Sequence, residues 1–203
     1  MANTNRPFGL RPVRYLNGTP WTGAARPYYV PSNYATAFYI GDPVVIVGDS
    51  NDNAYMGFPP GALSEINIGV AGDGTAITGV VVSIHPVTAQ SAVYKPASTE
   101  ALVYVCDDPN VVFELQDDGG GSPSADWVGW NANLIAGTGS TVTGRSGWAM
   151  DGGTSDGPDA DASNQLLILA LSARMDNEIG DYAVWDVLIN QHTYKPASGL
   201  GVA

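Results

Sequence analysis

The sequence predicts an all-β fold: an antiparallel β-sandwich, jelly-roll-like or barrel body that carries an extended N-terminal arm. Charged residues are scarce, at 14% of the 203 residues, whereas glycine and proline are frequent, with 25 and 14 copies. The apolar runs are short, many of their residues are β-branched, and clusters of Gly, Asp, Asn and Pro separate them. Short β-branched runs between turn residues are typical of strands in sandwiches and barrels.

The first 41 residues differ from the rest in charge, because they carry four arginines and no acidic residue. Residues 42–203 carry twenty acidic residues against four basic ones. Prolines interrupt the N-terminal segment, and each proline removes a backbone donor and prevents a helix. The segment is also rich in aromatic residues, whose side chains need a surface on which to be buried. We therefore expect an extended docking arm over residues 1–41 and a β-rich body over residues 42–203.

Nine side chains of the predicted arm are expected to contact a partner. An arm of arginine, proline and aromatic residues suits a protein groove, where main-chain hydrogen bonds and apolar anchors would hold it. The residues expected to bind are Arg6, Phe8, Leu10, Arg11, Arg14, Tyr15, Trp21, Arg26 and Tyr28.

Seven apolar runs of the body are predicted to be strands. The turn Asp107-Asp108-Pro109-Asn110 separates two of them at a length that suits a β-hairpin. The run over residues 165–174 also fits a helix of about three turns, but it lacks a polar face at helical spacing, which favours a central strand. The expected strands lie at residues 44–47, 77–84, 101–106, 111–115, 127–135, 166–171 and 182–189.

Three long acidic loops are expected at the ends of the body, where loops carry contacts. They cover residues 48–57, 117–126 and 150–163. The sequence also allows a short helical turn near residues 62–65.

One segment comes close to a phosphate-binding loop. Residues 139–146 differ from that pattern by one residue, since Arg145 stands where the pattern has lysine. Lysine reaches the terminal phosphates as a compact charge, and arginine is not equivalent there. A helix must also begin at this position, whereas Gly147-Trp148-Ala149 is a poor helix start. We interpret the segment as a polar hairpin between two strands.

No catalytic, cofactor or metal site is predicted. The acidic loop over residues 151–161 offers oxygen ligands for Ca²⁺, but its glycine and glutamate spacing does not match the helix-loop-helix calcium pattern, so a solvated loop is the better interpretation. The two histidines, His85 and His192, are too few for a zinc site or a histidine-based triad. Cys106 is expected to be a buried small hydrophobe. We therefore expect that the protein is not an enzyme.

Charge and hydropathy argue against two kinds of partner. The net charge of −12 disfavours direct contact with nucleic acid, because phosphate binding needs clustered lysine and arginine. No apolar stretch approaches the length of a membrane span, so no membrane partner is expected. The N-terminus lacks the apolar segment of a secretory signal.

The stretch over residues 7–20, PFGLRPVRYLNGTP, opens a series of segments spread over nearly the whole chain. The further segments are residues 28–31, 40–44, 103–109, 112–118, 137–141, 176–180 and 185–190. Together they resemble a family of tailed-bacteriophage virion proteins, which are small structural proteins encoded near the major capsid protein. The resemblance supplies no catalytic residues.

The resemblance implies a component of the virion. From the size, the acidity and the arm, we expect a capsid cement (decoration) protein that binds the outer surface of the head and stabilises contacts between subunits of the major capsid protein. Its partners would be the major capsid protein and copies of itself, as a homotrimer or a dimer, because shells repeat identical contacts around symmetry axes. The alternatives are a head–tail connector or minor tail protein, and a virion-displayed carbohydrate-binding protein that uses exposed tryptophans.

Overall fold

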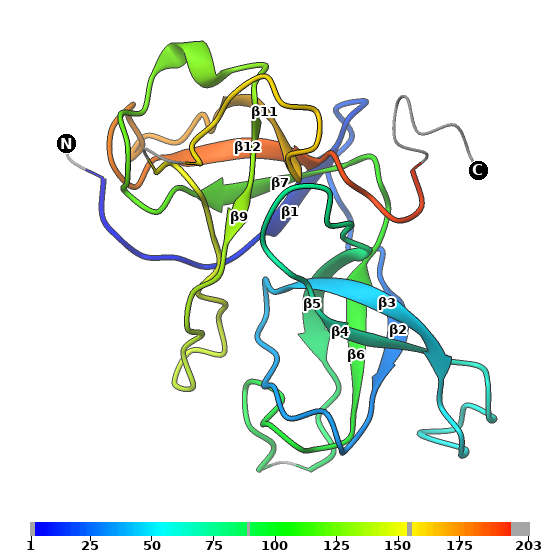
Figure 1. The fold of residues 1–203 in the computed structure, drawn as a ribbon. Helices are drawn as coiled ribbons and strands as arrows, with labels where there is room; N and C mark the ends of the chain where they lie inside the picture. The colour runs from blue at the N-terminus through cyan, green and yellow to red at the C-terminus, as the bar shows by residue number, and fades with distance from the viewer. Residues whose placement is uncertain (1–2, 89, 154–155, 196–203) are drawn as a thin grey trace.

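The chain forms two β bodies, a five-stranded sheet and a closed five-stranded barrel (Figure 1). The computed structural model describes residues 3–88, 90–153 and 156–195. Within these residues the single helical element is a 3₁₀ turn, η1, at Ala125–Trp127. The all-β prediction is therefore confirmed. The strands are β1 (Arg11–Tyr15), β2 (Arg26–Val30), β3 (Pro43–Ser50), β4 (Ser64–Ile68), β5 (Gly79–Ile84), β6 (Ala101–Cys106), β7 (Val111–Gln116), β8 (Asn131–Ala132), β9 (Leu134–Ile135), β10 (Ala149–Met150), β11 (Leu166–Leu171) and β12 (Val184–Ile189).

The sheet has the strand order β1-β7-β12-β11-β8, and all of its pairings are antiparallel. All six residues of β7 are buried, as suits a strand with neighbours on both sides. Its side chains pack with Trp127, Trp148 and Trp185 in the first of two hydrophobic cores. Strands β9 and β10 form a separate antiparallel pair.

The barrel has the strand order β2-β4-β3-β5-β6. Its pairings are antiparallel except between β2 and β4, which run parallel. It encloses the second core, which contains no tryptophan and is made mainly of valine, isoleucine and aromatic side chains. Phe38 in this core is fully buried. The barrel was one of the predicted alternatives, and a jelly roll is not confirmed.

The barrel is inserted between two neighbouring strands of the sheet. β1 precedes the barrel in the sequence and β7 follows it, yet the two pair, from Arg11 opposite Glu114 to Tyr15 opposite Val111. Directly beyond that ladder, the Leu16 amide donates a hydrogen bond of 2.7 Å to the Asn110 carbonyl. The chain therefore leaves the sheet and returns to it at the same place.

The turn between β6 and β7 forms, but the hairpin predicted around it is wrong. The Asn110 amide donates to the Asp108 carboxylate at 2.8 Å, which is the expected turn chemistry. β6 nevertheless pairs with β2 and β5 in the barrel, whereas β7 pairs with β1 and β12 in the sheet. The turn is the point at which the chain crosses from one body to the other.

The structure does not confirm an extended arm over residues 1–41. β1 is an edge strand of the sheet, and β2 is a strand of the barrel, held by β6 and β4. The physical reason is burial, because Tyr28, Val30 and Phe38 fill the chain's own second core. Within the described residues, only 3–10 precede the first strand.

The remaining expectations have mixed outcomes. β11 confirms a strand rather than a helix over residues 166–171, and it lies inside the sheet between β12 and β8. The loop over residues 136–148 joins the paired strands β9 and β10, so the hairpin interpretation of this segment is confirmed. The expected strand over residues 127–135 is wrong, since only β8 and β9 form within it. No helical turn forms near residues 62–65, because β4 begins at Ser64.

Candidate functional site

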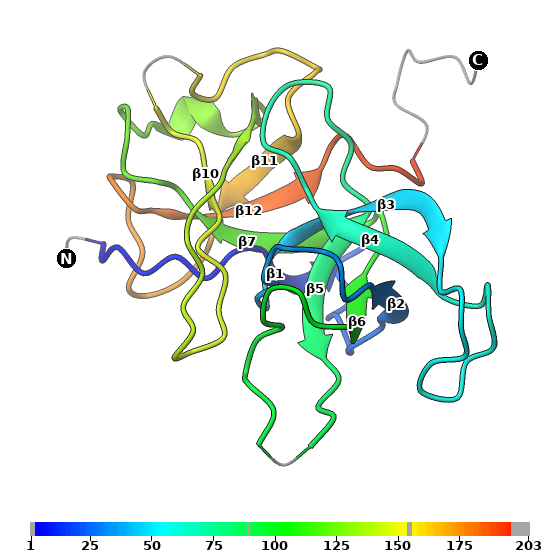
Figure 2. The same ribbon diagram turned by 60° about the horizontal axis from the view of Figure 1, so that its bottom comes forward.

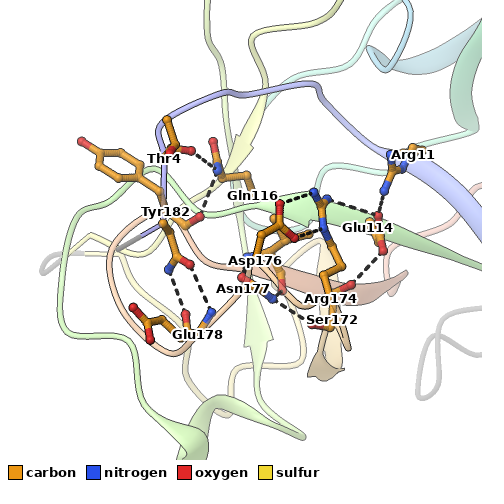
Figure 3. Close-up of polar contacts among 12 residues, drawn as sticks. Thr4, Arg11, Glu114, Gln116, Ser172, Arg174, Asp176, Asn177, Glu178 and Tyr182 are labelled. Carbon is orange, nitrogen blue, oxygen red and sulfur yellow. Dashed lines mark hydrogen bonds and ion pairs between the residues drawn. The ribbon is translucent and has the colours of Figure 1, made fainter. Parts of the chain in front are cut away.

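Residues 3–10, called the N-terminal segment below, cross the β9–β10 loop (residues 136–148) before the chain enters β1 (Figure 2). The segment is held mainly by side chains rather than by a strand ladder (Figure 3). Gln116, at the end of β7, donates to the Thr4 carbonyl at 2.9 Å and accepts from the Arg6 amide at 2.8 Å. Asn3 donates to the carbonyls of Glu178 and Asp181. These contacts fix the backbone from Asn3 up to the Arg6 amide.

Two glycines fix the next part of the segment. Gly9 and Gly41 both have positive φ angles, of 70° and 100°. A Cβ atom on Gly9 would lie 2.3 Å from the Gly41 carbonyl oxygen and 2.5 Å from the Ser146 Cβ. The Leu10 amide donates to the Gly41 carbonyl at 2.9 Å. The N-terminal segment, the start of the barrel and the β9–β10 loop therefore meet at a point where only glycine fits.

Below the segment, arginines and acids form a connected network (Figure 3). Glu114 on β7 pairs with Arg11, lies 3.8 Å from Arg174 and accepts a hydrogen bond of 2.7 Å from the Ser172 hydroxyl. Arg174 also binds both carboxylate oxygens of Asp176, each at 3.2 Å. The Arg174 contact lowers the pKa of Asp176, and the same hydrogen bond raises the pKa of Arg174. The network holds two guanidinium groups in fixed positions.

These elements enclose an open groove of about 630 Å³, called the arginine groove below. Four of the chain's six arginines line it, namely Arg6, Arg11, Arg145 and Arg174, together with a single acid, Asp176. Arg11 and Arg174 belong to the network below. Arg6 and Arg145 are exposed, and neither has an ion-pair partner within the described residues. The groove is thus a local basic site on a protein of net charge −12.

A second hollow, of about 290 Å³, adjoins the arginine groove and is called the apolar pocket below. The two share Phe8, Arg11 and Arg145 as lining residues. The rest of the apolar pocket comes from Leu10, Pro12 and Trp21 and from residues that precede β3 or lie in β5, namely Ile40, Gly41, Val81 and Val82. The site therefore lies where sheet and barrel meet, with charge on one side and apolar surface on the other.

Exposed apolar side chains border the arginine groove. Met175, between Arg174 and Asp176, is 105% exposed relative to its reference, and Val142, next to the lining residue Thr143, is 85% exposed. Methionine, arginine and aromatic residues are enriched at protein interfaces, where their burial contributes binding energy. The border thus has the composition of a surface that binds another protein.

The structure brings together five of the nine residues predicted to bind a partner. Phe8 and Arg11 line both hollows, Arg6 lines the arginine groove, and Leu10 and Trp21 line the apolar pocket. Leu10 itself is 1% exposed, so it serves as a wall rather than as the projecting anchor that was predicted.

The other four predicted residues lie elsewhere. Arg14 pairs with Asp186 of the sheet at 3.1 Å, and Tyr15 borders a separate hollow beside Asn110. Arg26 pairs with Asp107 at 3.5 Å, away from the groove. The prediction is wrong for Tyr28, which is 4% exposed in the barrel and donates to Asp107 at 2.7 Å. Its aromatic ring is part of the second core.

Two lining arginines were missed as binding residues. The sequence did draw attention to Arg145, because this residue interrupts the phosphate-loop pattern. That pattern, however, concerns a phosphate ligand and not a protein partner. No sequence pattern marked Arg174, because its position beside Arg11 depends on the pairing of distant strands.

Two further titratable side chains, Cys106 and His192, are buried outside the groove. No group of three or more His, Cys, Asp or Glu side chains that could hold a metal ion occurs within residues 3–88, 90–153 and 156–195. Burial raises the pKa of the Cys106 thiol to about 12 and lowers the pKa of His192 to about 4, so neither is poised to react near neutral pH. The arginine groove is the stronger candidate for a functional site, and it is built for binding.

No protein-family model, curated protein or solved structure matches the chain. In the part of the chain that the structure describes, no helix is long and apolar enough to cross a membrane.

Proposed function

We propose that the protein is a structural component of a tailed-bacteriophage virion, a capsid cement protein that binds the outer surface of the head and stabilises contacts between major capsid protein subunits. The observation that carries the binding part of this proposal is the arginine groove beside the apolar pocket. It gathers unpaired arginines, a half-buried phenylalanine and exposed apolar side chains into one surface. The sequence segments that resemble virion proteins support the choice of partner.

The fold suits a non-catalytic role of this kind. Two β bodies, each with its own buried core and both packed against Ile68, make a scaffold on which loops present contacts. Copies bound around the symmetry axes of a shell would contact each other as well as the capsid, which is the basis for proposing a homotrimer or a dimer.

The nearest rival is a head–tail connector or minor tail protein, which would use the same kind of surface. The number of copies per virion separates the two roles. A cement protein occupies every equivalent position on the shell, whereas a connector occupies one vertex. Quantitative gel analysis of purified virions would distinguish them.

A carbohydrate-binding role has less support. It needs exposed tryptophans, but Trp127, Trp148 and Trp185 are buried. Trp130, at 39%, is the most exposed of the five, and Trp21 is half-buried in the apolar pocket. A glycan array would test this role directly.

The proposal is tested by adding the purified protein to expanded heads that lack it and measuring cosedimentation. We expect the wild-type protein to bind and a variant with Arg6→Glu and Arg145→Glu to bind much more weakly. Arg26→Glu, which reverses a charge on the barrel away from the groove, is the matched control. The proposal fails if the wild-type protein does not bind heads at all.

A further inference from the structure

We propose that the arginine groove and the apolar pocket bind an extended acidic peptide segment of the partner, with carboxylates on the arginines and an apolar side chain in the pocket. This inference rests on the docking role proposed above and specifies the chemistry of what docks. It is carried by two observations, the unneutralised charge in the groove and the shared wall between groove and pocket.

The charge in the groove selects a carboxylate ligand. Glu114 and Asp176 occupy part of the bonding capacity of Arg11 and Arg174 and hold them in place. Arg6 and Arg145 have no ion pair within the described residues, so their guanidinium donors face solvent. A planar guanidinium binds a carboxylate through two parallel hydrogen bonds, which makes arginine well suited to this ligand.

The apolar pocket favours a ligand that carries apolar side chains as well as charged groups. Phe8, Arg11 and Arg145 line both the groove and the pocket, so a ligand that reaches Arg145 also reaches the half-buried side chains of Trp21, Ile40 and Val82. Side chains of an extended peptide alternate in direction, which lets neighbouring residues serve the two hollows. An acidic peptide with interspersed apolar residues matches both.

Nucleic acid is the weaker fit, although it too is an anion. The protein carries twenty acids against eight basic residues, and this excess repels a polyanion at a distance. A few carboxylates on a peptide suffer less repulsion and can pair one by one with the available arginines.

The test uses a fluorescently labelled short peptide of alternating glutamate and leucine as the probe, with binding measured by fluorescence anisotropy. Two comparison peptides replace either every glutamate by glutamine or every leucine by serine, and a labelled oligothymidine serves as the polyanion. We expect the glutamate–leucine peptide to bind most tightly. We expect each replacement, and a rise in salt, to weaken binding about tenfold or more.

The protein variants locate the binding. Arg6→Gln with Arg145→Gln should weaken peptide binding about tenfold or more, because it removes the two available guanidinium groups. Lys195→Gln and Arg26→Gln remove equal charge elsewhere and should leave binding unchanged. All four substituted side chains are exposed, so circular dichroism should show an intact fold for each variant.

Three outcomes would overturn the inference. Equal binding of the glutamate and glutamine peptides, or tighter binding of oligothymidine, would show that carboxylates are not selected. Sedimentation of the protein alone that reveals self-association lost in the double arginine variant would show that a second copy occupies the site. If the peptide does not bind while cosedimentation with heads still depends on Arg6 and Arg145, the inference falls and the proposed docking role stands.

Discussion

Strands β1 and β2 come from the same arginine- and proline-rich segment, but they have different surroundings. β1 lies at the edge of the sheet with no fully buried residue, whereas β2 pairs on both sides in the barrel and buries Tyr28 and Val30. The difference teaches that local composition did not decide their roles. Position in the fold makes β2 part of a core and leaves β1, with the N-terminal segment before it, to form a surface.

The largest expected difference in stability between variants of β1 and β2 comes from replacing one valine of each strand by aspartate. Val30→Asp would bury an unpaired charge in the barrel, and we expect it to cost about 4 kcal/mol or more of unfolding free energy. Val13→Asp, at a half-buried position of β1, should cost only about 1 kcal/mol. Urea unfolding followed by circular dichroism measures both. Equal losses would contradict the distinction between the two strands.

The buried carboxylate of Asp42 lies directly after residues 1–41, and it should make the stability of the fold depend on pH. Burial raises the pKa of Asp42 to about 6 from 3.8, while the Tyr39 amide and Ser146 donate to it. Because the folded-state pKa is raised, the proton stabilises the fold below about pH 4, and this contribution disappears as the pH rises through 6.

We therefore expect the stability of the wild type relative to Asp42→Asn to fall by up to about 3 kcal/mol between pH 4 and pH 7. Asparagine keeps the acceptor for the Tyr39 amide and removes the titration. Urea midpoints across this range test the prediction, and a constant difference between the two proteins would refute it.

The glycine contact under the N-terminal segment gives a matched pair of variants. Gly9 and Gly18 both have positive φ angles, but a Cβ on Gly9 meets the Gly41 carbonyl, whereas a Cβ on Gly18 meets nothing within 4 Å. Gly18→Ala should cost about 1 kcal/mol from backbone strain alone. Gly9→Ala should cost about 2 kcal/mol more, mostly by releasing the segment, and hydrogen exchange at residues 10 and 41 would detect that release. Similar costs for both would exclude the close contact.

The smallest expected effects concern the ion pairs of the two strands. Arg14→Gln on β1 breaks a pair with Asp186 that is about one-third exposed on the arginine side, and it should cost less than about 1 kcal/mol. Arg26→Gln on β2 breaks a longer and more exposed pair with Asp107, and its cost should be smaller still. Thermal unfolding of the two variants ranks them, and a larger loss for Arg26→Gln would reverse the expectation.

The sequence predicts the central strands of the fold well. β6, β7 and β11 are short apolar runs bounded by turn residues, and in β6 and β7 that pattern follows from burial on both faces. β1 and β2 escape the same reasoning because proline and arginine lie within them. The arginines are tolerated because Arg14 and Arg26 each pair with an acidic residue, which depends on tertiary pairing.

The candidate site is predictable only in part. The charge and aromatic content of the first residues indicated Arg6, Phe8 and Arg11 as binding residues, and the structure places them at one groove. Arg145 and Arg174 join them through the β9–β10 loop and the end of β11. No spacing in the sequence encodes that approach, since it arises from insertion of the barrel between β1 and β7.

The Leu16–Asn110 hydrogen bond joins two residues that the whole barrel separates in sequence. Closing so long a loop in an unfolded chain is entropically costly. If the barrel folds first, it brings these two residues together and β1 can dock on β7 as if across a short turn. The five tryptophans all lie outside the barrel strands, so on refolding their fluorescence should recover later than the hydrogen-exchange protection of the barrel amides. Barrel-first folding would make the position of the insertion decide the order in which the two bodies form.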